Sequence, residues 1–246
     1  MTVPPFSLLH HAMRWWRSRP QQRRMTNVIC YEAVIFDLDG TLLDTLGDLA
    51  ASTNRTLTHF GFPQRSLEEV RQFVGNGVEM LIHRAVPSGT GEKQTQECLT
   101  WFKQDYMVHM RDQTAPYPGV QNLLKSLRNS GCKVGVVSNK FDGAVKELCW
   151  EHFGDLLPVA IGERPGRQKK PARDLVDLCV SELNVHPDRC VYVGDSDVDI
   201  LTALNAGLPC LSVSWGFRSR KFLMEHGATV IVDTPEELWE KLCLLS

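Results

Sequence analysis

Short apolar runs alternate with helical segments along most of this 246-residue chain. These runs, many of them β-branched, predict strands at residues 33–36, 133–137, 159–161, 190–193, 210–213 and 229–232. Helical patterns lie between most of them, at residues 119–129, 143–152, 172–183, 197–205 and 236–244. Because crossover helices cover both faces of a parallel sheet, this alternation predicts an α/β fold with a doubly wound, mainly parallel sheet.

One long gap interrupts the alternation, because residues 38–132 contain no convincing strand. Helical patterns occupy residues 45–60, 66–73, 78–85 and 92–111 of this gap. The second of them opens with serine followed three residues later by glutamate, the spacing of a capping box. An insertion of this length cannot be a simple crossover, so we expect an inserted all-α cap over residues 45–115 and a core made of residues 30–44 and 116–246.

Charge is distributed unevenly along the chain. The formal net charge of −2 gives no reason to expect a nucleic-acid partner. Residues 1–31 hold five arginines and no acidic residue, which leaves 22 basic and 29 acidic residues for the rest. We interpret residues 1–29 as a disordered leader. The alternatives are an upstream start codon with the working start at Met25, a transit peptide, or a membrane-surface helix.

The eight cysteines include no CxxC pair, and most of them lie in apolar runs. This usage is typical of small buried hydrophobes in a reducing compartment, so we expect a cytoplasmic protein. No run approaches the ~18 apolar residues of a membrane span, so we expect no membrane partner. The sequence leaves the oligomeric state open.

Polar groups follow four of the predicted strands, within residues 37–41, 138–140, 169–171 and 194–199. In open α/β sheets, ligands bind beyond the carboxyl ends of the strands, so we expect these groups to meet. Carboxylates crowded at one edge destabilise a fold unless a cation compensates them. A hard divalent cation such as Mg²⁺, with a lysine beside it, would attract a phosphoryl group.

Asp37 and Asp39 can divide the chemistry between them. Residues i and i+2 of an extended segment point to the same side, and Gly40 lets the chain turn sharply after them. One carboxylate can attack phosphorus and form an aspartyl-phosphate. The other can protonate the leaving oxygen and then accept a proton from the attacking water.

Four motifs occur in order at these strand ends: DLDGT, VVSNK, KKP and GDSDVD. In this order and context, they resemble the haloacid-dehalogenase-like phosphatase superfamily over about residues 30–244. The stretches FVGNGVEMLIHRA, YPGV and VSWGF are similar to its phosphoglycolate phosphatase branch. The resemblance implies a HAD-like Rossmannoid core with a small helical cap that closes over the site.

The resemblance also implies roles for individual residues. It makes Asp37 the nucleophile and Asp39 the general acid/base. It implies that Mg²⁺ is held by Asp37, the backbone carbonyl of Asp39, and Asp195. The candidate contacts to the substrate are Thr41, Ser138, Asn139 and Lys170. Ser196 and Asp199 are expected behind these contacts and the metal. Lys169 remains an alternative to Lys170.

Two features of the cap are candidates for substrate recognition. The loop Gly75, Asn76 and Gly77 is either a plain helix connector or a loop that touches substrate. Arg84 could bind a substrate carboxylate through two parallel hydrogen bonds, although a solvated helix face is the stronger interpretation.

We therefore predict a Mg²⁺-dependent phosphomonoester hydrolase that acts through an aspartyl-phosphate on a small phosphorylated metabolite. The leading candidate for the substrate is 2-phosphoglycolate. A pyrophosphatase or a phosphosugar phosphatase on the same fold is the alternative, and a non-catalytic regulatory protein on the same scaffold is a more distant one.

Overall fold

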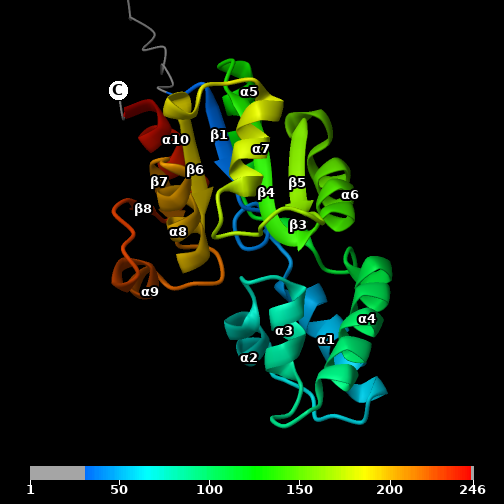
Figure 1. The fold of residues 1–246 in the computed structure, drawn as a ribbon. Coiled ribbons are helices and arrows are strands. Elements are labelled where there is room, and N and C mark those ends of the chain that lie inside the picture. The colour runs from blue at the N-terminus through cyan, green and yellow to red at the C-terminus, as the bar shows by residue number, and fades with distance from the viewer. Residues whose placement is uncertain (1–30, 245–246) are drawn as a thin grey trace, which may run out of the picture.

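The computed structural model describes residues 31–244, and a six-stranded parallel sheet forms its centre (Figure 1). The strands are β1 (Ala33–Phe36), β4 (Lys133–Phe141), β5 (Val159–Glu163), β6 (Cys190–Gly194), β7 (Cys210–Val213) and β8 (Ile231–Val232). They lie in the order β5-β4-β1-β6-β7-β8, and each neighbouring pair is parallel. The predicted α/β class with a mainly parallel sheet is confirmed.

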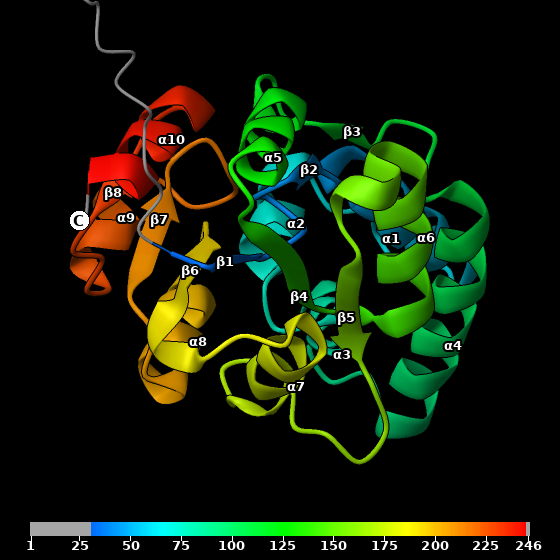
Figure 2. The ribbon, with the colours of Figure 1, turned by 90° about the horizontal axis from the view of Figure 1, so that it is seen from above.

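Helices cover both faces of this sheet, as Figure 2 shows. One face carries α7 (Asp174–Leu183) and α8 (Asp197–Ala206), and the other carries α5 (Val120–Asn129), α6 (Asp142–Phe153) and α10 (Pro235–Leu244). Strand β1 is buried on both sides: Ala33 and Ile35 join the core beneath α7 and α8, while Val34 and Phe36 join the opposite core. This two-sided burial explains why its sequence is continuously apolar up to Asp37.

The helical segment forms a separate lobe beyond the carboxyl ends of the strands (Figure 1). It contains α1 (Leu46–His59), α2 (Leu67–Phe73), α3 (Val78–Ala85) and α4 (Glu92–His109). The capping box is present, since the Ser66 hydroxyl accepts a hydrogen bond from the Glu69 amide and the Glu69 carboxylate accepts one from the Ser66 amide. We call this lobe the cap. Apolar side chains of the cap and of one face of the sheet form a single hydrophobic cluster.

Several short elements are absent from the sequence-based prediction. They are the paired strands β2 (Leu43–Asp44) and β3 (Ala115–Pro116), the helix α9 (Arg220–Glu225), and two 3₁₀ turns at Gly154–Leu156 and Pro187–Arg189. None of these elements contains an apolar run or a helical repeat long enough to be recognised. Strand β4 also runs further than predicted and includes residues 138–140, so these polar groups lie within the strand and not after it.

The predicted leader, residues 1–29, lies outside the described residues. Within residues 31–244, the structure contains no helix that combines the length and the apolar character needed to cross a bilayer.

Asp48 joins the two chain segments that connect the cap to the core. It lies in the first turn of α1 and is 1% exposed. Its carboxylate accepts hydrogen bonds from the backbone amides of Gln113 (3.0 Å) and Thr114 (2.9 Å) and from the Thr114 hydroxyl (2.8 Å). This buried carboxylate therefore holds the entry to the cap and the exit from it together, next to the pairing of β2 with β3.

We predict that Asp48→Ala lowers the free energy of unfolding by about 2–3 kcal/mol, because it leaves buried amides without an acceptor. Denaturant unfolding followed by circular dichroism measures the change. The exposed Glu97→Ala on α4 is the control, with an expected change within about 0.5 kcal/mol. Equal effects of the two substitutions would contradict this role of Asp48.

Candidate active site

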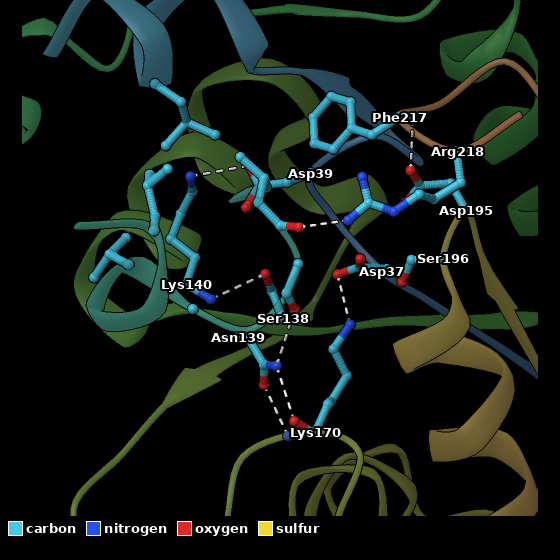
Figure 3. A pocket seen from close by; sticks show the side chains of 16 residues that line it. Asp37, Asp39, Ser138, Asn139, Lys140, Lys170, Asp195, Ser196, Phe217 and Arg218 are labelled. Carbon is cyan, nitrogen blue, oxygen red and sulfur yellow. Dashed lines mark hydrogen bonds and ion pairs between the residues drawn. The ribbon is translucent and has the colours of Figure 1, made fainter. Parts of the chain in front are cut away.

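The polar ends of β1, β4 and β6 and the loop before α7 meet in one cavity beneath the cap (Figure 3). The core contributes polar side chains to its wall: Asp37, Asp39, Ser138, Asn139, Lys140, Lys170, Asp195, Ser196 and Arg218. The cap contributes a largely apolar wall: Leu49, Val74, Gly75, Gly77, Val78 and Leu81. Charged groups thus face a surface from which water can be excluded.

Three carboxylates crowd together at the floor of this cavity and directly behind it. Asp37, Asp195 and Asp199 each place one oxygen within 4.8 Å of the others, and all three are buried. Burial, followed by the charge of Asp199, raises the pKa of Asp37 well above its ordinary value and raises the pKa of Asp195 to about 7. A cation bound here would relieve this repulsion.

Lys170 provides part of that compensation. Its Nζ lies 2.8 Å from Asp37 Oδ1 and 2.8 Å from Asp199 Oδ1, and its side chain is almost completely buried. The neighbouring Lys169 instead lies on the cap side, with Nζ 3.7 Å from the Glu79 carboxylate. The structure therefore places Lys170 rather than Lys169 beside Asp37.

Asp199 is fully engaged behind the cavity. Its Oδ1 accepts hydrogen bonds from Lys170 and from the Tyr192 hydroxyl (3.2 Å), and its Oδ2 accepts one from the Ser196 hydroxyl (2.6 Å). Ser196 and Asp199 also form the capping box of α8. These contacts leave Asp37 and Asp195 as the carboxylates best placed to hold a cation, and their hard oxygen atoms fit a divalent metal.

Asp195 is held tightly by the loops around it. Its Oδ2 accepts a hydrogen bond from the Phe217 amide (2.7 Å), and its Oδ1 accepts one from the Thr41 hydroxyl (3.2 Å). Gly40, at φ +85°, packs so closely that any side chain there would collide with the Asp195 carboxylate. Thr41 is buried and absent from the described wall of the cavity, and its hydroxyl donates to Asp195 in this structure.

The carboxylates of Asp37 and Asp39 each keep one oxygen for chemistry. Among the described residues, hydrogen bonds and ion pairs to Asp37 fall on Oδ1, which accepts from the Leu38 amide and from Lys170. Contacts to Asp39 likewise fall on Oδ1, which accepts from the Thr45 hydroxyl (2.7 Å) and from Lys140 (2.9 Å). Oδ2 of each aspartate is thus left for a reacting group.

The side-chain amide of Asn139 is occupied by hydrogen bonds to the protein itself. Its Oδ1 accepts a hydrogen bond from the Lys170 amide (2.8 Å), and its Nδ2 donates to the carbonyls of Lys170 (3.0 Å) and Gly75 (3.3 Å). It therefore joins β4, the lysine loop and the cap. Ser138 lines the cavity, and its hydroxyl oxygen accepts from the Lys140 amide, which leaves its proton to donate.

The cap candidates separate into two groups. Gly75 and Gly77 line the cavity, whereas Asn76 and Arg84 line a second hollow on the outside of the seam between cap and core. Arg84 donates to the Phe73 carbonyl (2.8 Å) and to Asn76 Oδ1 (2.9 Å). Its guanidinium thus holds the Gly75–Gly77 loop in place and is absent from the described cavity wall.

Two charged residues of the cavity wall carry no role in the sequence-based prediction. Lys140 pairs with Asp39 and donates to the Tyr106 hydroxyl of α4 (2.8 Å). Arg218 donates to the carbonyls of Arg71 (2.8 Å) and Val74 (2.7 Å) at the end of α2, and so attaches the core to the cap. Their only signal in the sequence is their position, directly after the polar motif of β4 and after the VSWGF stretch.

Comparison with known proteins agrees with this geometry. The haloacid dehalogenase-like hydrolase family model matches residues 34–213. The chain belongs to the haloacid dehalogenase-like hydrolase family. A phosphoglycolate phosphatase from Pseudomonas aeruginosa is 33% identical over 83% of this chain and 77% of its own length. One from Chromobacterium violaceum is 32% identical over 85% of this chain and 95% of its own length.

A solved structure supports the same assignment. A protein from Lactobacillus delbrueckii subsp. bulgaricus, provisionally assigned as a phosphoglycolate phosphatase, is 38% identical and superposes with a TM-score of 0.83. The match covers 87% of this chain and 99% of that protein. The sheet, the cap and their connection are therefore shared with a relative across nearly its whole length.

We predict that Asp37→Asn lowers turnover of a phosphomonoester by more than about a thousandfold, because an amide is a poor nucleophile towards phosphorus. The fold should remain, since Lys170 keeps its ion pair with Asp199. Steady-state kinetics and circular dichroism measure the two effects. The exposed Asp188→Asn is the control and should retain full activity. A tenth of wild-type activity in the Asp37 variant would contradict a nucleophilic Asp37.

Proposed function

We propose that the protein is a Mg²⁺-dependent phosphatase that hydrolyses a small phosphomonoester, with 2-phosphoglycolate as the leading candidate for the substrate. The observation that carries this proposal is the buried group of Asp37, Asp39, Asp195 and Lys170 beneath a closed cap. The names of the P. aeruginosa and C. violaceum relatives support the substrate. An intact nucleophile and its charged partners disfavour a non-catalytic regulatory protein.

In the first step, Asp37 Oδ2 attacks phosphorus. A bond forms between that oxygen and phosphorus while the bond from phosphorus to the ester oxygen breaks. Asp39 donates its proton to the departing ester oxygen, which leaves as an alcohol. Lys170, 2.8 Å from Asp37 Oδ1, holds the nucleophile in place, and the Ser138 hydroxyl is positioned to donate to a phosphoryl oxygen.

In the second step, water attacks the phosphorus of the aspartyl-phosphate. Asp39, now ionised, accepts a proton from that water, and the bond between phosphorus and Asp37 breaks to release inorganic phosphate. Both carboxylates then return to their starting states. Thr45 and Lys140 hold Asp39 from the side away from its reacting oxygen throughout both steps.

Asp37 and Asp195, with the backbone carbonyl of Asp39 as a further donor, would hold the Mg²⁺ ion. When bound, this ion offsets the negative charge of the phosphoryl oxygens and of the crowded carboxylates. Asp199 fixes Lys170 and Ser196 behind these ligands.

We also propose that the enzyme works in a reducing compartment. Six described cysteines form no disulfide, which supports a reducing compartment such as the cytoplasm: Cys98, Cys132, Cys149, Cys179, Cys190 and Cys210.

The test is a panel of phosphate compounds assayed with Mg²⁺, with EDTA and with Ca²⁺. We expect phosphate release from 2-phosphoglycolate with the highest kcat/KM, and lower values for pyrophosphate, a hexose phosphate and an aryl phosphate. Activity should disappear in EDTA, return with Mg²⁺ and fall with Ca²⁺, whose looser coordination suits in-line transfer poorly. Full activity in metal-free protein would contradict the requirement for a metal. A higher kcat/KM for pyrophosphate or the hexose phosphate would contradict 2-phosphoglycolate as the preferred substrate.

A further inference from the structure

Lys140 is a buried cation at the boundary between the core and the cap. It is 3% exposed, and it lies at the end of β4, on the wall of the cavity (Figure 3). Its Nζ lies 2.9 Å from Asp39 Oδ1 and 2.8 Å from the Tyr106 hydroxyl, and 4.6 Å from the centre of the Tyr106 ring. Burial, the largest single influence, lowers the pKa of Lys140, but the charge of Asp39, the Tyr106 hydroxyl and the hydrogen bonds to both together hold this pKa above its ordinary value.

This ammonium group has a hydrogen-bond donor to spare. An ammonium carries three N–H donors. Within residues 31–244, the side-chain partners of Lys140 are Asp39 and Tyr106, which account for two. Because Lys140 lines the cavity, the third donor is available to a molecule bound there.

Asp39 fixes where the leaving group of the substrate must lie. As general acid, it has to approach the ester oxygen within hydrogen-bond distance. In a 2-phospho-carboxylic acid, one carbon separates that oxygen from the carboxylate, whose oxygens then lie within roughly 3–4 Å of it by covalent geometry. A cation that already contacts Asp39 is therefore within reach of the carboxylate.

The other cations of the described cavity wall are less suitable. Lys170 sits between Asp37 and Asp199, on the phosphoryl side of the site. Arg218 donates to two carbonyls of the cap, and its charge acts on Asp195. Arg84, which the sequence offers as a possible contact to a substrate carboxylate, lines the outer hollow.

We propose that Lys140 is a specificity-determining residue whose free N–H binds the carboxylate of the substrate's leaving group. This inference rests on the proposed function, since it concerns the same reaction. The Tyr106 hydroxyl, which comes from cap helix α4, holds the ammonium in position, so the closed cap and the selective contact occur together.

The test compares two substrates that differ only in this carboxylate: 2-phosphoglycolate and ethyl phosphate. We measure kcat/KM for both with the wild type, Lys140→Met and Lys140→Gln. The glutamine variant keeps a hydrogen-bond donor for Asp39 without the charge, so it separates loss of charge from disturbance of Asp39. The control Lys146→Met removes an exposed lysine of α6, whose ion pair with Asp142 lies outside the cavity.

We expect the preference for 2-phosphoglycolate over ethyl phosphate to fall by about 10- to 150-fold in both Lys140 variants, as for a lost charge-assisted hydrogen bond. The preference should be unchanged in Lys146→Met. Inhibition constants provide a second measurement. The Lys140 variants should bind 3-phosphonopropionate more weakly by a similar factor. Their affinity for propylphosphonate, which lacks the carboxylate, should change little.

Failure of the Lys140 role and failure of the proposed substrate would give different results. If the wild type prefers 2-phosphoglycolate but the Lys140 variants lose activity on both substrates equally, Lys140 does not recognise the carboxylate and the proposed function stands. If the wild type itself shows no preference between the two substrates, both the proposed substrate and the role of Lys140 are overturned.

Discussion

Repulsion among buried carboxylates is the constraint on which the rest of this structure depends. Asp37 follows β1, Asp195 follows the neighbouring β6, and Asp199 lies in the first turn of α8. One oxygen of each lies within 4.8 Å of the others, where water cannot screen them. Lys170 forms two short ion pairs with this group, and Ser196 caps the helix that carries Asp199. We propose that the charge that remains attracts a divalent cation and, with it, a phosphoryl group.

The cap completes this arrangement with a second buried ion pair. Lys140 and Asp39 lie where the apolar wall of the cap meets the polar floor of the core, and Tyr106 of the cap touches the lysine. In the low dielectric beneath the cap, charge interactions are stronger than in water. Arg218 joins the core to the end of α2, and Asp48 joins the entry to the cap to its exit.

Much of the fold and part of the site could be predicted from the sequence. Parallel strands bring their carboxyl ends to one edge, so the order of strands and motifs along the chain is enough to place distant residues such as Asp37, Ser138 and Lys170 together. The direction of a side chain is harder to predict. Whether Lys140 points inward and Arg84 outward depends on packing between cap and core, which local periodicity does not encode. Helix α9 and strands β2 and β3 are too short to leave a periodic signal.

The most direct test of the central claim is to trap the covalent intermediate. Enzyme with Mg²⁺ is mixed with ³²P-labelled substrate in a single turnover, quenched in acid, reduced with borohydride and sequenced by mass spectrometry. An aspartyl-phosphate is an acyl phosphate, so borohydride should convert Asp37 alone to homoserine, in proportion to the label bound before reduction. Homoserine at Asp39, or release of phosphate with no label on the protein at any time point, would contradict the account.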